Sequence, residues 1–141
     1  MATDQSPLYL TRDGARRYVA HNGSTTIIVG DKNLYDDVFN PGELLQLALA
    51  GCAAMSADTT LSHRLGDDAV ITAGVGSELD EDTNRFTAIA VEIVASMDTL
   101  DEDDRAALIE RTSRAIQKYC TVARTVTAEF DYSVSVTGEL S

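Results

Sequence analysis

The chain has 141 residues, of which 44% are hydrophobic, and this content is typical of one globular domain. Its formal net charge of −12 repels phosphate backbones, so binding of nucleic acid through a basic face is not expected. No segment is polar enough to be predicted disordered. We therefore expect a single domain over residues 1–141, with a solvated acidic surface.

Targeting and metal-binding signals are weak. The first ten residues lack the basic start and apolar centre of a secretory signal, and we expect no stretch long enough to span a bilayer. We therefore expect a cytoplasmic protein, in which both cysteines are present as thiols. Two cysteines and two histidines without CxxC or HExxH spacing predict no metal site.

The N-terminal part reads as three short strands, near residues 7–12, 15–20 and 24–29. Asp13–Gly14 and Asn22–Gly23 are the expected turns, because both pairs tolerate positive φ angles. These strands predict a three-stranded antiparallel sheet, followed by a loop over residues 30–39.

A long helix is expected next. Asn40 is a favourable N-cap, Pro41 suits the first helical position, Glu43 completes a capping box, and Gly66 ends the helix. Leucines and alanines cover every side of its first half. Since a helix that is apolar all round must be buried all round, we expect a second subunit to cover part of it.

The second half predicts a β-hairpin over residues 69–79 and 85–97, a helix over 101–120 and a last strand over 125–138. The stripe expected to be buried on this second helix contains Ala106, Ile109, Ser113, Ile116 and Cys120. The fold class is therefore α+β: an N-terminal three-stranded antiparallel sheet, a long central helix, and a second antiparallel sheet with a second helix.

Two cysteines are the candidate reactive groups. Cys52 lies between small residues, Gly51 and Ala53, and Cys120 ends the apolar stripe of its own helix. Both could be inert packing residues, since free cysteine behaves as a small hydrophobe. Alternatively, two crossing helices could bring the two sulfurs together.

The segment NPGELLQLALAGCAAMSADTT (40–60), followed downstream by AIQKYCTVARTV (115–126), resembles the OsmC/Ohr family of thiol peroxidases. The resemblance implies an intertwined homodimer with active sites at the subunit interface. It implies that Cys52 is the peroxidatic thiol and Cys120 the resolving thiol in the reduction of small organic hydroperoxides. A dithiol such as a lipoylated protein would be the reductant, and no bound cofactor is implied.

Such a site needs an ionised sulfur. A thiol of pKa ~8.5 is only about 3% thiolate at pH 7, and a shift to ~6 requires roughly 3.4 kcal/mol. One guanidinium at ~4 Å, at an effective dielectric of ~20, supplies about 4 kcal/mol. Arg12, in an Arg-Asp-Gly turn, is the nearest match to the arginine used in the organic-hydroperoxide branch of the family; Arg16, Arg17 and Arg124 are the alternatives.

One position departs from the family pattern. Peroxidase members often carry glutamate as the third residue of an N-P-E motif, where this chain has Gly42, with the carboxylate one position later in Glu43. Nine residues of helix place Glu43 on the face opposite Cys52, so it could orient an arginine only across a dimer interface. Closing the cap with Asn40 is the simpler role for Glu43.

The departure at Gly42 leaves a second function open: a non-catalytic dimer of the same fold that binds small apolar ligands or acts as a stress-associated protein. His63 lies near the end of the long helix and His21 in a hairpin turn, and both are expected to be solvated.

Overall fold

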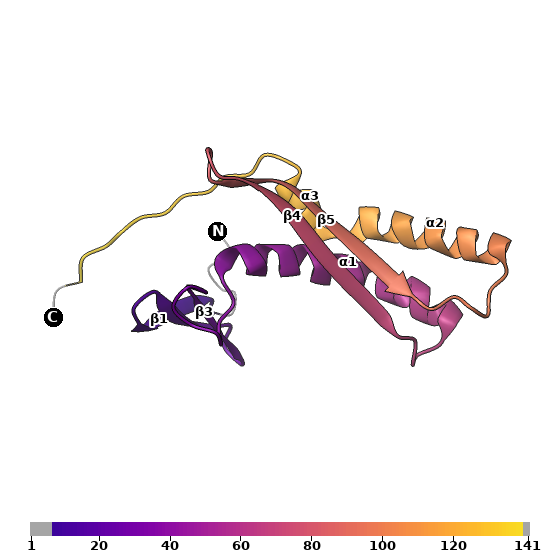
Figure 1. The fold of residues 1–141 in the computed structure, drawn as a ribbon, viewed down its shortest axis with the longest axis horizontal. Coiled ribbons are helices and arrows are strands. Elements are labelled where there is room, and N and C mark those ends of the chain that lie inside the picture. Colours follow the sequence, from indigo (N-terminus) through magenta and orange to yellow (C-terminus); the bar gives the residue numbers. More distant parts are fainter. Residues whose placement is uncertain (1–6, 140–141) are drawn as a thin grey trace. The chain divides into compact units, whose positions relative to one another are not determined.

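The computed structural model describes residues 7–139, in which three helices and five strands follow one another along the chain (Figure 1). They divide between two compact units, one of residues up to Ala48 with Ser77–Ile89 and one of Leu49–Gly76 with the residues from Ala90 onward. In order the elements are β1 (Tyr9–Gly14), β2 (Arg17–His21), β3 (Thr26–Gly30), α1 (Pro41–Leu65), β4 (Ile71–Asp80), β5 (Arg85–Ala95), α2 (Glu102–Tyr119) and α3 (Thr121–Val126).

β1, β2 and β3 form the predicted antiparallel sheet, in sequence order. Each strand begins about two residues later than expected, and the first turn is not Asp13–Gly14. A register shift between Arg12 and Gly14 carries the strand past that pair, so that the chain turns at residues 15–16 with Arg16 at φ 53°. The second turn contains Gly23 at φ 98°, as predicted.

The predicted capping box at the start of α1 is confirmed. The Glu43 backbone N–H donates to Asn40 Oδ1 at 2.7 Å, and the Asn40 N–H donates to Glu43 Oε1 at 2.9 Å. At the other end Gly66 adopts φ +107°, and its N–H donates to the carbonyl of Ser62 at 2.7 Å. Both ends of the 25-residue helix therefore lie where its capping residues place them.

The expectation that no stretch has the length of a membrane span was wrong for α1. This helix is long and apolar enough to cross a bilayer by length and composition. A helix at the centre of a protein core meets the same criteria, and α1 buries Leu49, Ala50, Ala53, Ala57 and Leu61 within the chain. Only 28% of this apolar window is buried within the chain, and Leu47 and Met55 stay exposed, so packing inside the chain accounts for part of the apolar sequence of α1.

α2 packs along α1 in the second unit, and the two helices run in opposite directions (Figure 1). Ala57 and Leu61 of α1 meet Leu108 of α2 in a cluster that also contains Leu100, and Ile71 of β4 and Ile93 of β5 pack against it. The buried residues of α2 are Leu108 and Thr112 rather than the predicted Ala106, Ile109 and Ser113. Ile109 is 51% exposed, whereas Ile116 packs against the cluster and Cys120 is 2% exposed, so the predicted stripe is wrong in its first half and correct in its second.

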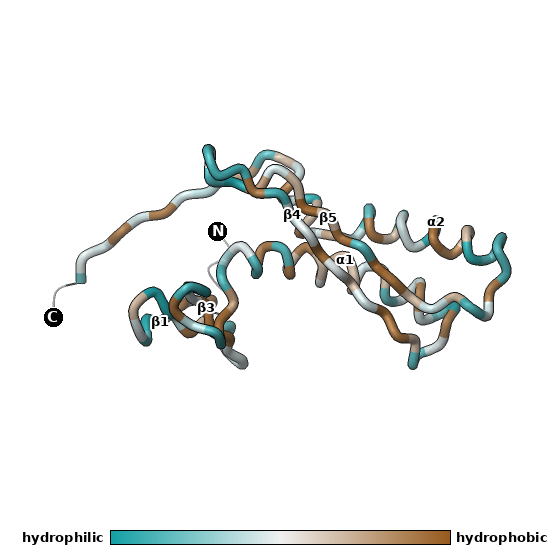
Figure 2. The backbone as a smooth tube through the Cα atoms, in the orientation of Figure 1, coloured by the Kyte–Doolittle hydropathy of each residue, from teal (hydrophilic) through white to brown (hydrophobic). Residues whose placement is uncertain are grey.

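The C-terminal part differs from the prediction. Residues 121–126 form α3, and residues 129–139 form no strand, although their apolar residues alternate as expected. Figure 2 shows this alternation along the segment. A strand needs a neighbour that accepts its backbone hydrogen bonds, and the described chain pairs no strand with these residues.

The Leu108 side chain is fully buried, so its truncation tests the core directly. Leu108→Ala should lower the free energy of unfolding by about 2–5 kcal/mol, because it removes buried methyl groups and leaves a cavity. Ile109→Ala, on the next residue of the same helix, is the control and should cost clearly less. Urea denaturation followed by circular dichroism measures both, and equal losses would contradict the assigned core.

Candidate functional site

Cys52 lies in the middle of α1 and is half-buried. Its neighbour Gly51 faces open space, since a Cβ atom added there would meet no atom within 4 Å. The Ser56 hydroxyl, one turn later, donates to the backbone carbonyl of Cys52 at 2.8 Å, and not to its sulfur. The thiol is thus held on a regular helix with small residues beside it.

Cys120 lies at the point where α2 ends and α3 begins, and is only 2% exposed. Its N–H still donates to the Ile116 carbonyl at 3.0 Å, but its backbone leaves the helix with φ −77° and ψ 92°. A new helix starts at Thr121, and the first N–H groups of a helix have no acceptor within it. The break therefore leaves several N–H donors next to the Cys120 side chain.

The structure brings the two cysteines together: the Cys120 thiol and the N–H groups of Val122 and Thr121 lie close enough to the Cys52 sulfur to influence its pKa. The Val122 N–H is the strongest influence and lowers the pKa of the Cys52 thiol. Partial burial opposes it, while the Cys120 thiol and the Thr121 N–H lower the pKa further. The balance leaves the pKa of Cys52 below its ordinary value.

The pKa of the Cys120 thiol moves the other way. Burial raises it most, and both the hydrogen bond to Cys52 and the charge on an ionised Cys52 raise it as well. The N–H groups of Ala123 and Val122 oppose this only in part. Cys52 therefore loses its proton more readily than Cys120 does.

The candidate arginines make other contacts. Arg16 pairs with Asp31 at 2.7 Å, and Arg17 bridges Asp13 and Asp37 at 3.0 Å each. Arg124, in the unit that holds both cysteines, donates to the carbonyl of Lys118 at 3.0 Å.

Arg12 lies exposed in β1, in the other unit from the cysteines. That one of these arginines stabilises the Cys52 thiolate stays a prediction. Within residues 7–139, none of the groups that lower the pKa of Cys52 is an arginine.

Glu43 and Gly42 lie in the first turn of α1. The Glu43 carboxylate accepts the N–H of Asn40, which is the capping role expected from the sequence. A Cβ atom at Gly42 would lie 3.0 Å from Cζ of Phe86, within the same unit. The ring of Phe86 thus occupies the space that a glutamate at this position would need.

The sequence did not predict the N–H donors of residues 121–123. It predicted instead that a cationic side chain lowers the pKa of Cys52. A backbone donor leaves no residue-type signal, and the same segment would read equally well as a continuation of α2. The break of the helix at Cys120 frees these donors, and no residue type in the sequence signals it.

Three kinds of comparison agree on the relatives of this chain. Residues 34–135 match the model of the family described as OsmC-like protein. An uncharacterized protein of Mycobacterium tuberculosis is 37% identical over 120 residues, which cover 84% of this chain and 87% of the relative.

Among solved structures, a hypothetical protein from Aquifex aeolicus has a TM-score of 0.69 at 20% identity and covers 86% of each chain. The organic hydroperoxide resistance protein OhrB of Bacillus subtilis has a TM-score of 0.50 at 19% identity, over 84% of this chain and 88% of that one. These structural likenesses concern the fold.

The role of the α3 donors can be tested at Thr121. Thr121→Pro removes one N–H from the Cys52 sulfur at a first-turn position that accepts proline, and Cys120 before it is already extended. The pKa of Cys52 should rise, so that its alkylation by iodoacetamide has a higher pH midpoint. Thr121→Ala keeps the N–H and should leave the midpoint unchanged; the same midpoint in both variants would contradict the assignment.

Proposed function

The chain belongs to the OsmC-like protein family, and we propose that it is a thiol-dependent peroxidase that reduces organic hydroperoxides through Cys52 and Cys120. The observation that carries the proposal is that Cys52 of α1 lies beside Cys120 at the end of α2, with the pKa of the first thiol lowered and that of the second raised. A peroxidatic cysteine must be a thiolate within reach of solvent, whereas a resolving cysteine acts only after the first has been oxidised.

The reaction would proceed in two steps. The Cys52 thiolate attacks one oxygen of the hydroperoxide, the O–O bond breaks, and the alkoxide leaves as an alcohol after taking up a proton, so that Cys52 becomes a sulfenic acid. The Cys120 sulfur then attacks the Cys52 sulfur, a disulfide forms and water departs. A dithiol reductant then reduces the Cys52–Cys120 disulfide by thiol–disulfide exchange, and is itself oxidised to a disulfide. Our candidate for this reductant is a lipoylated protein.

Each part of the pair has a matching task. The N–H groups of Val122 and Thr121 lower the pKa of Cys52, so they would stabilise the thiolate that attacks the hydroperoxide. The depth of Cys120, at 2% exposure, protects the resolving thiol from direct oxidation until the sulfenic acid forms beside it. Rapid closure of the disulfide prevents further oxidation of Cys52.

A second candidate, a non-catalytic dimer that binds small apolar ligands, is favoured by one observation. Phe86 occupies the space beside Gly42, so the carboxylate of the N-P-E pattern has no equivalent at that position. This candidate requires thiols that do not react with hydroperoxide, which separates it from the peroxidase.

Consumption of cumene hydroperoxide by reduced protein, followed with dihydrolipoamide as reductant, tests the proposal. Cys52→Ser should abolish turnover, because it removes the nucleophile. Cys120→Ser should retain the first attack but stop after about one equivalent of hydroperoxide per chain. Wild-type activity in Cys52→Ser would refute the peroxidase and support the non-catalytic dimer.

We also propose that two chains form a homodimer. Phe130, Tyr132, Val134 and Val136 are 62–98% exposed along an extended segment, and Met55 of α1 is 80% exposed. Extended segments with free backbone donors and one apolar face pair readily with a strand of another chain. A second copy would supply that pairing and cover the apolar side chains.

Sedimentation equilibrium should give twice the chain mass of 15.1 kDa at micromolar concentration. Val134→Pro removes a backbone donor from the segment and should weaken the dimer, whereas Val134→Thr keeps both the donor and the β-branched shape and should not. A monomer in the wild type would contradict the proposed assembly, as would an unchanged dimer in Val134→Pro.

A further inference from the structure

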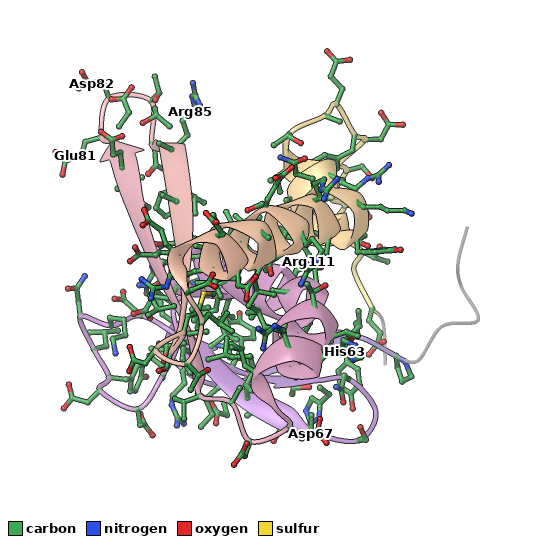
Figure 3. The ribbon with its side chains drawn as sticks, turned by 90° about the vertical axis from the view of Figure 1, so that its right-hand side faces the viewer. His63, Asp67, Glu81, Asp82, Arg85 and Arg111 are labelled. Carbon is green, nitrogen blue, oxygen red and sulfur yellow. The ribbon has the colours of Figure 1, made fainter. Side chains whose placement is uncertain are left out.

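A cluster of cationic and hydroxyl side chains lies between α1 and α2, apart from the two cysteines. It lines a pocket of about 450 Å³, to which α1 contributes Thr59, Thr60 and His63 and α2 contributes Arg111 and Arg114. All five residues belong to the same unit. Figure 3 shows Arg111 and His63 projecting from the two helices on the side that faces the viewer.

The position of the pocket follows from the antiparallel helix pair. Arg64 of α1 pairs with Asp104 near the start of α2 at 3.5 Å, and Cys52 meets Cys120 at its end. Thr59, which lies between those two contacts, is seven residues from Cys52, or about 10 Å along the helix axis. The pocket and the thiol pair are therefore separate places on the same two helices.

The charge of the pocket is unusual for this chain. With 23 acidic and 11 basic residues, carboxylates are abundant, yet none is among the side chains that line it. Glu110 approaches Arg114 at 4.0 Å, and Asp104 is engaged with Arg64. Within residues 7–139 Arg111 makes no ion pair and no side-chain hydrogen bond, whereas Arg16 and Arg17 both pair with aspartates.

Two guanidinium groups three residues apart on one helix face repel each other, which costs free energy unless an anion lies between them. A guanidinium offers planar pairs of N–H donors that match the oxygens of carboxylate and phosphate. The hydroxyls of Thr59 and Thr60 and the imidazole of His63 add further donors from the facing helix. Every polar group that lines the pocket can thus donate to an oxyanion.

We propose that this pocket is a binding site for an oxyanion, a carboxylate or a phosphate, distinct from the site of Cys52 and Cys120. Its volume falls within the range of small-molecule sites and exceeds that of a single ion. The space therefore admits an oxyanion carried by a small organic molecule, such as an organic acid or a phosphate monoester, as well as the free ion. The proposal does not depend on the peroxidase activity.

Titration with inorganic phosphate and, separately, with sodium acetate, at constant ionic strength in sodium chloride, tests the site. Amide resonances of Thr59, Thr60 and His63, followed by heteronuclear NMR, should move and saturate with at least one of the two anions. The anion that saturates at lower concentration identifies the preferred group. Shifts that grow linearly with both anions, or equally with chloride, would overturn the proposal.

Arg111→Gln removes the guanidinium and its charge, shortens the side chain by two atoms, and should weaken binding at least about tenfold. Arg85→Gln is the matched control, because Arg85 is also exposed but its guanidinium donates to the Phe86 carbonyl in the other unit. It should leave the affinity unchanged, and equal weakening in both variants would show a diffuse charge effect and overturn the site. The alkylation rate of Cys52 should not change in Arg111→Gln, so this test stands independently of the thiol chemistry.

Discussion

The chemistry assigned to this chain depends on the break between α2 and α3 at Cys120. Were α2 to continue, the N–H groups of Thr121 and Val122 would donate to carbonyls one turn earlier and would be unavailable to a sulfur. Because the backbone turns out of the helix at Cys120, those donors are released beside Cys52. The same turn buries the Cys120 thiol, so one local feature lowers the pKa of one cysteine and raises that of the other.

The remaining parts of the second unit keep the two sulfurs in contact. α1 presents Cys52 from a long regular helix, and the cluster around Leu61 and Leu108 holds α2 antiparallel to it. The Arg64–Asp104 pair lies farther along the same helix pair, although an exposed ion pair of this kind contributes little. Burial of apolar side chains is thus the main restraint on the distance between the thiols, and the backbone donors act within that frame.

Features of the fold that depend on neighbouring residues were predicted correctly. Features that depend on pairing between distant segments were predicted less well. Asn40, Glu43 and Gly66 act through their immediate neighbours, and the ends of α1 were accordingly predicted correctly. The first hairpin turn was missed because a register shift after Arg12 depends on cross-strand pairing. The alternation of Phe130, Tyr132 and Val134 indicates a strand, but a strand exists only with a partner, and the described chain pairs none with it.

The candidate site shows the same division. The meeting of Cys52 and Cys120 could be anticipated from their positions on apolar stripes together with the family resemblance. The donors that lower the pKa of Cys52 could not, because backbone N–H groups are common to almost every residue. A guanidinium from Arg12 or its neighbours, if it reaches the site, would add to a pKa that backbone donors already lower.

The most direct test of the central claim is the mass of the intact, reduced chain after one equivalent of cumene hydroperoxide. The account predicts the loss of two hydrogen atoms, through a disulfide between Cys52 and Cys120 that peptide mapping locates. Replacement of Cys120 by serine should yield instead the gain of one oxygen atom at Cys52. An unchanged mass in the wild type, or oxidation that begins at Cys120, would contradict it.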